Sequence, residues 1–217
     1  MPKSEGSTAD EIIRCARTLI VSGGYNGFSY ADIAESVGIR KPSVHHHFPT
    51  KLNLVCMLVQ QYRAEFAAGV AEIERRSADP LESIRAYVGF WEGCIAEPTS
   101  AFCVCALLAA EIPSLPEQLV VELTAHFKEL SEWLTSVLER GVRQGCIVLS
   151  GEVLSESETF MATIHGAMLS ARAYRDPGIF QVIARNAVDK LTPLQVIRPP
   201  VKSRSTNQKQ RDKENSQ

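Results

Sequence analysis

The sequence predicts an all-α protein of about nine helices, and three observations support this fold class. Apolar residues recur at the three- and four-residue spacing of helices, and no stretch sustains the alternation typical of a strand. Capping residues and glycine or proline stops separate these periodic segments. With 45% hydrophobic and 22% charged residues, the 217-residue chain has the composition of a packed globular protein.

Capping and stop signals set the expected bounds of each helix in turn. Thr8-Ala-Asp-Glu11 resembles a capping box, and Gly23-Gly24 ends the helix that it opens. Prolines at 42 and 80 suit first helical turns, whereas those at 113, 116 and 193 end helices. The expected helices span about 8–23, 29–38, 42–47, 50–77, 80–98, 100–113, 117–145, 155–175 and 178–191. Residues 198–217 are polar and are expected to form a disordered tail.

Composition and charge narrow the class of protein. The longest apolar run, 101–110, is half of the roughly 20 residues that a membrane span needs, so we expect no membrane association. Six cysteines without paired spacing fit a reduced cytosol, and the sequence predicts a cytoplasmic protein. The formal charge is −2, and residues 56–197 are acidic. Any binding to nucleic acid must therefore use a local surface.

Two short segments, 29–38 and 42–47, have the pattern of a helix-turn-helix. Gly38 supplies the left-handed turn between them, and Val44 and Phe48 return the second helix to the core. The face left outside carries hydrogen-bond donors and no acid, which suits the major groove of DNA. Its residues are Arg40, Lys41, Ser43, His46 and His47.

The stretch 27–52 resembles the DNA-binding signature of TetR-type repressors. The matching features are Asp32-Ile33-Ala34, Gly38, the His47-Phe48 pair and Lys51, and the likeness extends over about residues 8–68. His45 departs from the pattern, because the family usually has tyrosine there.

The resemblance implies a homodimeric repressor that binds a palindromic operator and is released by a small-molecule or thiol-reactive effector, with no enzymatic activity and no cofactor. It implies a DNA-binding domain at 8–68, with its helix-turn-helix at about 31–50, and a ligand-binding and dimerisation domain at 69–197. Base contacts are expected from Lys41, Pro42, His45 and His46, and Arg40 could contact base or phosphate. Phosphate contacts are expected from Ser29, Ser43, His47, Thr50 and Lys51.

Apolar stripes on segments 155–175 and 178–191 suggest the dimer surface, with Gly166 allowing close helix approach. The alternative is that both stripes pack only within the subunit, and the family resemblance favours the dimer. The stripes consist of Met161, Ile164, His165, Met168, Leu169 and Arg172, and of Phe180, Ile183, Ala187, Val188 and Leu191.

Cys103 is the candidate sensor residue. Ser100 as N-cap would place it at the third position of a helix, where the dipole favours a thiolate. Residues 102–118 also look like a branch of the family that senses electrophiles or oxidants through a cysteine in this segment. The alternative is an inert core thiol. Candidates for lining an effector cavity are Trp91, Phe102, Phe127 and His165, with core packing as the alternative for each.

Two other function classes remain as alternatives. Cys103 with His126 or His165 could form the nucleophile and base of an enzyme, although nothing in the sequence brings them together. A ligand-independent architectural DNA-binding protein would not need the large apolar segment after residue 68. We expect no metal site, because consecutive helical side chains such as those of His45, His46 and His47 diverge.

Overall fold

A computed structural model describes residues 7–96 and 102–193. Within these ranges the chain forms nine α-helices, a short 3₁₀ helix and no strand, which confirms the predicted fold class. The helices are α1 (Thr8–Gly23), α2 (Tyr30–Val37), α3 (Lys41–His47), α4 (Lys51–Arg76), α5 (Pro80–Ala96), α6 (Val104–Ala109), α7 (Glu117–Gln144), α8 (Val153–Tyr174) and α9 (Pro177–Leu191), with the 3₁₀ helix η1 (Ile112–Ser114) after α6. Ser100 and the predicted tail at 198–217 lie outside the described residues.

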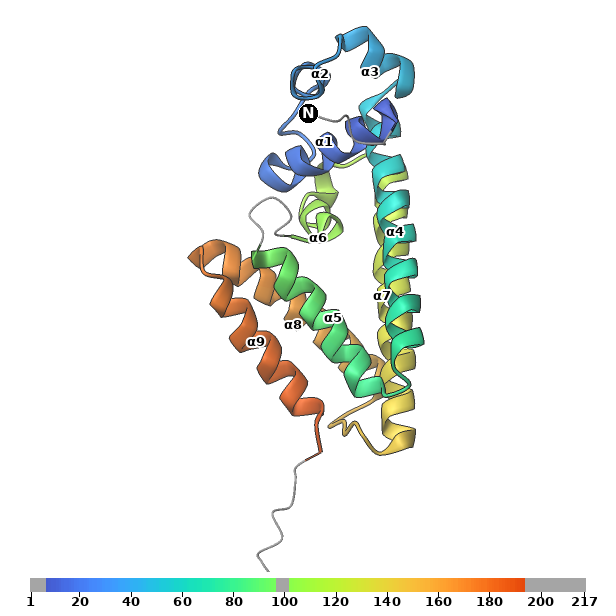
Figure 1. The fold of residues 1–217 in the computed structure, drawn as a ribbon, viewed down its shortest axis with the longest axis vertical. Helices are drawn as coiled ribbons and strands as arrows, with labels where there is room; N and C mark the ends of the chain where they lie inside the picture. The colour runs from blue at the N-terminus through green and yellow to red at the C-terminus, as the bar shows by residue number, and fades with distance from the viewer. Residues whose placement is uncertain (1–6, 97–101, 194–217) are drawn as a thin grey trace, which may run out of the picture.

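The helices form a small head and a larger body (Figure 1). Helices α1 to α3 make the head at one end of the molecule, and α4 runs from the head into the body beside α7. Helices α5, α8 and α9 complete the body, and the short α6 lies under α1. The head is thus joined to the body by the continuous helix α4 and by the contact between α1 and α6.

Capping interactions explain the helix starts in the head. The α1 N-cap is Ser7 rather than Thr8, because the Ser7 hydroxyl accepts from the backbone N–H of Asp10 while the Asp10 carboxylate accepts from that of Ser7. Ser29 and Asp32 form the same reciprocal box at α2. Gly38 ends α2 at φ 75°, the left-handed conformation that the sequence predicts for the turn into α3.

The start of α6 differs from the prediction. The helix begins at Val104, and Cys103 is its N-cap in an extended conformation, with φ −65° and ψ 113°. The prediction of a third helical position for Cys103 is therefore wrong, and so is the dipole argument built on it. Phe102 and Cys103 are both buried, which anchors this segment in the core before the helix begins.

Most of the apolar stripes on α8 and α9 are buried within the subunit. These two helices pack against each other, and α7 and α5 cover them further. For the buried residues, the alternative of packing within the subunit is correct, and the dimer assignment of their side chains is wrong. They are Met161, Ile164, Met168, Phe180, Val188 and Leu191. The apolar side chains of Leu169 and Val182 remain more than half exposed on the outside of the pair.

Ion pairs connect α4 to α7 at several points along the two helices. The Arg63 guanidinium contacts the carboxylates of Glu122 and Glu129, and Arg140 on α7 contacts Glu74 on α4. The hydrogen bonds to both glutamates raise the pKa of Arg63, so its charge is fixed at any physiological pH.

Candidate DNA-reading surface and buried cysteine cluster

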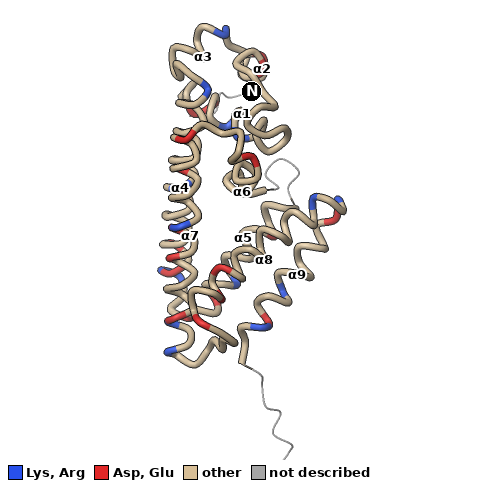
Figure 2. Tube along the Cα trace, turned by 180° about the vertical axis from the view of Figure 1, so that it is seen from behind, with Lys and Arg blue, Asp and Glu red and all other residues tan. Residues whose placement is uncertain are grey.

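The outer face of α3 is a polar, solvent-facing surface on the head. A hollow of about 500 Å³ lies against α3 and the start of α1. Its lining includes Arg40, Pro42, Ser43, His46 and His47, of which all but the half-buried Ser43 are exposed. Lys41 is exposed as well, and α3 carries no acidic residue (Figure 2). This arrangement offers several donors to a groove of DNA without charge repulsion.

Internal contacts hold α3 in place beneath this face. Val44 is fully buried, and the buried Tyr30 hydroxyl donates to the Phe48 carbonyl at 2.8 Å. Burial raises the pKa of Tyr30 to about 12, so the hydroxyl keeps its proton and remains a donor. The His45 ring packs on Tyr30 at 4.6 Å between centroids, and its Nδ1 lies 3.3 Å from the Pro49 carbonyl oxygen. His45 is therefore engaged within the head, although its side chain is exposed.

The remaining predicted phosphate contacts lie at helix starts. Ser29 is the N-cap of α2, and Thr50, the N-cap of α4, accepts a hydrogen bond from the Asn53 backbone N–H. Lys51 is placed differently from the others. Its ammonium donates to the Phe28 carbonyl and lies over the Tyr25 and Phe28 rings, so this half-buried lysine binds the head's own backbone.

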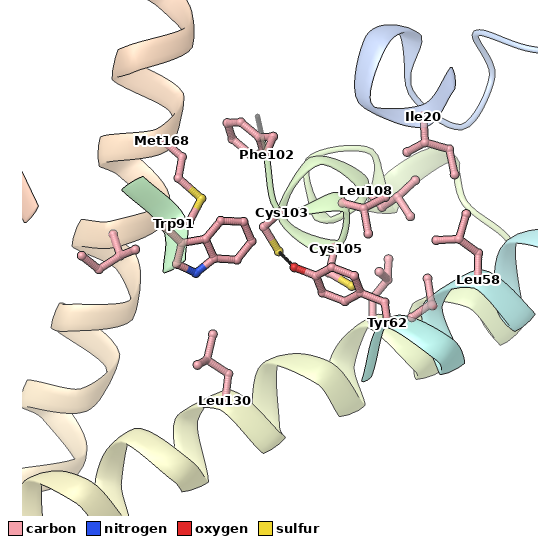
Figure 3. Close-up of a cluster of buried hydrophobic side chains, with 14 of the residues drawn as sticks. Ile20, Leu58, Tyr62, Trp91, Phe102, Cys103, Cys105, Leu108, Leu130 and Met168 are labelled. Atoms are coloured by element: carbon pink, nitrogen blue, oxygen red, sulfur yellow. Dashed lines mark hydrogen bonds between the residues drawn. The ribbon is translucent and has the colours of Figure 1, made fainter. Parts of the chain in front are cut away.

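A second group of reactive side chains lies inside the body, at the N-terminus of α6. Cys103 is 1% exposed, and the Tyr62 hydroxyl from α4 donates to its Sγ at 3.2 Å (Figure 3). Cys105 is fully buried close by. The aromatic side chains of Trp91 and Phe102 lie beside Cys103, on the side away from Cys105.

Two histidines complete this cysteine cluster. His126 on α7 is buried against the Tyr62 ring, and the half-buried His165 on α8 packs on Phe127 at 5.5 Å between centroids. His126 Nδ1 and His165 Nε2 are buried and have no hydrogen-bond partner among the described residues. The structure thus brings together Cys103, Phe127, His165 and His126, although nothing in the sequence indicated that Cys103 lies near either histidine.

The cluster controls the ionisation of Cys103. Burial alone would raise its pKa, but hydrogen bonding from Cys105 and the proximity of both histidines lower that pKa well below the ordinary thiol value. Burial and the neighbouring Cys103 raise the pKa of Cys105. Burial, followed by the adjacent thiols, also raises that of Tyr62. These shifts favour the thiolate form of Cys103 and the protonated forms of Cys105 and Tyr62.

A groove leads from solvent toward this cluster. It has a volume of about 530 Å³ between α1, α4 and α5, and its wall includes Tyr62, Tyr87 and Trp91. Arg17 of the head also lines the groove, where it pairs with Glu65 and lies 5.0 Å from the centre of the Tyr62 ring. Trp91 is among the residues that line this groove, and its contact with an effector stays a prediction.

A carboxylate just after α6 connects the body to the head. Both oxygens of Glu111 accept from the Tyr25 backbone N–H at 3.1 Å. Gly24 makes this approach possible, because its φ of 76° is left-handed and a Cβ there would collide with the Glu111 carboxylate. The short helix α6, whose N-cap is Cys103, is thus followed by a residue that contacts the loop leading into α2.

Within the described residues no group of three or more histidine, cysteine or acidic side chains could hold a metal ion. In the same part of the chain no helix is long and apolar enough to cross a membrane.

Comparisons with known proteins agree with these features. The family model for "Bacterial regulatory proteins, tetR family" matches residues 12–55, and that for "Tetracyclin repressor-like, C-terminal domain" matches residues 80–187. The chain is 22% identical to the HTH-type transcriptional repressor NemR of Escherichia coli K12 over 174 residues, which are 79% of this chain and 87% of that protein.

Solved structures give the same result. The crystal structure of a TetR family transcriptional regulator from Agrobacterium tumefaciens is 60% identical, with a TM-score of 0.84 over 85% of this chain and 97% of that one. The reduced form of E. coli NemR, at 19% identity, shares the fold with a TM-score of 0.76 over 86% and 98% of the two chains. With both family matches and a relative of this identity, the chain belongs to the TetR family of bacterial transcriptional regulators.

Proposed function

We propose that the protein is a homodimeric repressor whose binding to a palindromic operator is controlled by the modification of Cys103. The observation that carries this proposal is the double connection, through α4 and α6, between an acid-free face on α3 and a buried cysteine thiolate. A reading surface and a reactive site in one chain are the minimum that a one-component regulator requires.

In this proposal α3 enters the major groove. Lys41, Pro42 and His46 face base edges, and Arg40 faces a base or a phosphate. Ser29, Ser43, His47 and Thr50 face phosphates. His45 and Lys51 also contact DNA only if they give up part of their present contacts within the head, with Pro49 and Phe28 respectively.

The proposed dimer uses the outer surface of α8 and α9. Leu169 is 58% exposed and Val182 is 69% exposed, and Gly166 beside them permits close helix approach. Two copies packed through this face form a four-helix bundle with two-fold symmetry. The two α3 helices must then lie about 34–36 Å apart to enter successive major grooves.

The proposed effector is an electrophile or oxidant small enough to reach Cys103. The groove beside Tyr62, Tyr87 and Trp91 accepts its apolar part, and the Cys103 thiolate is the nucleophile. Modification adds volume at the N-cap of α6, inside a packed core, so α6 must shift. Glu111 transmits that shift to the head at Tyr25. The operator affinity falls because the modified state favours a different head position.

The test uses purified full-length protein with operators selected from random duplex DNA. Binding is measured over a salt series before and after treatment with N-ethylmaleimide, in the wild type, Cys103→Ser and Cys146→Ser. We expect palindromic sites, and loss of binding after treatment in the wild type and Cys146→Ser only. Loss that persists in Cys103→Ser would refute the role of Cys103, and absence of any selected site would refute the DNA-binding role.

A further inference from the structure

The proposed function uses only the thiol of Cys103, yet the thiol of Cys105 lies close to it. It lies two residues further along the chain and is 0% exposed. Burial, followed by the neighbouring Cys103, raises the pKa of Cys105, whereas the Cys105 side chain contributes to lowering that of Cys103. One sulfur is therefore a nucleophile and its neighbour a protonated thiol, which is the combination that formation of a disulfide from a sulfenic acid needs.

The backbone permits a bond between these sulfurs. Two residues of fully extended chain span at most about 7 Å between Cα atoms, and disulfides join Cα atoms about 4.4–6.8 Å apart. Within a helix, side chains at i and i+2 diverge, but Cys103 is the N-cap and has extended rather than helical dihedral angles. Its side chain is thus free of the helical geometry that would direct it away from Cys105.

We propose that a hydroperoxide oxidises Cys103 and that Cys105 resolves the product into an intramolecular Cys103–Cys105 disulfide. This inference rests on the proposed function, because it specifies a second, reversible mode of regulation at the same sensor site. Tyr62, whose hydroxyl donates to Cys103, lines the groove together with Tyr87 and Trp91, and in this proposal the peroxide enters the protein through that groove.

The chemistry balances in two steps. In the first, the Cys103 thiolate attacks the terminal oxygen of the hydroperoxide, the O–O bond breaks, and an alkoxide leaves and takes a proton to become an alcohol. The product is the sulfenic acid of Cys103. In the second, Cys105 loses its proton and its sulfur attacks the Cys103 sulfur, the S–O bond breaks, and water leaves. Two thiols are oxidised by two electrons, and the peroxide is reduced to an alcohol and water.

The disulfide changes the same contacts on which the regulation depends. It draws the Cys103 sulfur away from the Tyr62 hydroxyl that now donates to it, and it constrains the first turn of α6. Unlike an electrophile adduct, it adds no volume and is reversed by a dithiol. The pair therefore makes the response to peroxide recoverable.

The experiment treats the full-length protein with hydrogen peroxide, blocks remaining thiols with iodoacetamide and digests it with trypsin. Cys94, Cys103 and Cys105 all fall in the tryptic peptide 86–128. We expect this peptide to lose the mass of two hydrogen atoms, to carry one carbamidomethyl group, located at Cys94, and to regain both hydrogens after dithiothreitol. Cys94→Ala is the matched control and should keep the disulfide.

A second variant tests the order of events. In Cys105→Ala the disulfide should be lost, and dimedone should trap a sulfenic acid at Cys103. A disulfide to Cys94 or to a second chain, or a sulfinic acid at Cys103 beside a free Cys105, would overturn the inference. The mass of the wild-type peptide distinguishes these outcomes even if Cys105→Ala does not fold. The mass of the peptide tests only the disulfide. The proposed function is tested independently by the effect of N-ethylmaleimide on operator binding.

Discussion

Glu111 is the contact through which a change at α6 should reach the head, and its replacement tests this idea directly. Both carboxylate oxygens accept from the Tyr25 N–H at 3.1 Å, in a partly buried position. A hydrogen bond to a charged group contributes about 1.5–3 kcal/mol. Solvent can partly replace it here, so we expect Glu111→Ala to lower the free energy of unfolding by roughly 1.5–2 kcal/mol. For a chain of this size that corresponds to a decrease in Tm of about 3–8 °C.

The assay has two readouts at one protein concentration. Thermal unfolding followed by circular dichroism gives the change in Tm, and operator binding is measured with and without modification of Cys103. We expect Glu111→Ala to bind the operator when unmodified and to lose most of the difference between the two states. Glu111→Gln, which keeps a neutral acceptor, should be intermediate. Glu132→Ala, at an exposed position on α7, is the control.

The reasoning about Glu111 fails if Glu111→Ala leaves both the Tm and the response to modification at wild-type values. A lower Tm with an intact response to Cys103 modification would show that the Glu111 hydrogen bond is only a structural contact. The change at Cys103 would then have to reach the head through α4, the other connection between head and body.

Four further predictions concern the DNA surface, the dimer and the tail. Lys41→Ala and His46→Ala should change sequence preference by about 1–3 kcal/mol per lost contact, measured on specific and scrambled duplexes. Lys51→Ala should weaken binding to both duplexes and also lower Tm, since its ammonium binds the Phe28 carbonyl; an unchanged Tm would contradict this. Leu169→Glu should give monomers in sedimentation velocity, and a persistent dimer would contradict the proposed interface. Truncation after residue 197 should leave folding and dimerisation intact, and unfolding would refute it.

Local sequence signals were sufficient for the helices and for the head. The capping box at Ser29, the turn at Gly38 and the buried Val44 lie within a short segment, so periodicity and turn chemistry fix their arrangement without knowledge of the rest of the chain. The contacts of His45 and Lys51 within the head were not predicted, because both depend on side-chain directions toward backbone carbonyls rather than on any pattern of residue types.

The contacts of the cysteine cluster and the neighbours of the apolar stripes could not be predicted from the sequence. Tyr62 lies 41 residues from Cys103, and Tyr25 lies 86 residues from Glu111, so only the packing of α1, α4 and α6 brings these groups together. The stripes on α8 and α9 have the same period whether they pack within a subunit or between two subunits. Periodicity therefore identified most of the buried residues, although the predicted stripe also includes the exposed Leu169, and it could not say which neighbour covers them.

The ionisation of Cys103 makes a prediction about pH that also tests the role of the histidines. Burial opposes the thiolate, but Cys105, His126 and His165 outweigh it and lower the pKa of Cys103 well below the ordinary thiol value of about 8.5. Its alkylation rate should therefore rise less steeply with pH than that of an ordinary thiol, which reacts faster as its thiolate fraction rises.

The lowered pKa of Cys103 must also make the free energy of unfolding depend on pH, and the direction of this dependence is defined. Because the pKa of Cys103 is lower in the folded than in the unfolded protein, the unfolded state binds more protons between the two values. The stabilisation is complete above the unfolded pKa and is lost as the pH falls through the folded one. Cys103→Ser should abolish this slope, and His165→Phe should move the alkylation profile to higher pH. Cys56, whose pKa is raised by burial and by Glu122, is the internal control. An alkylation rate at Cys103 that rises with pH as steeply as that at Cys56 would show that the histidines do not stabilise the thiolate.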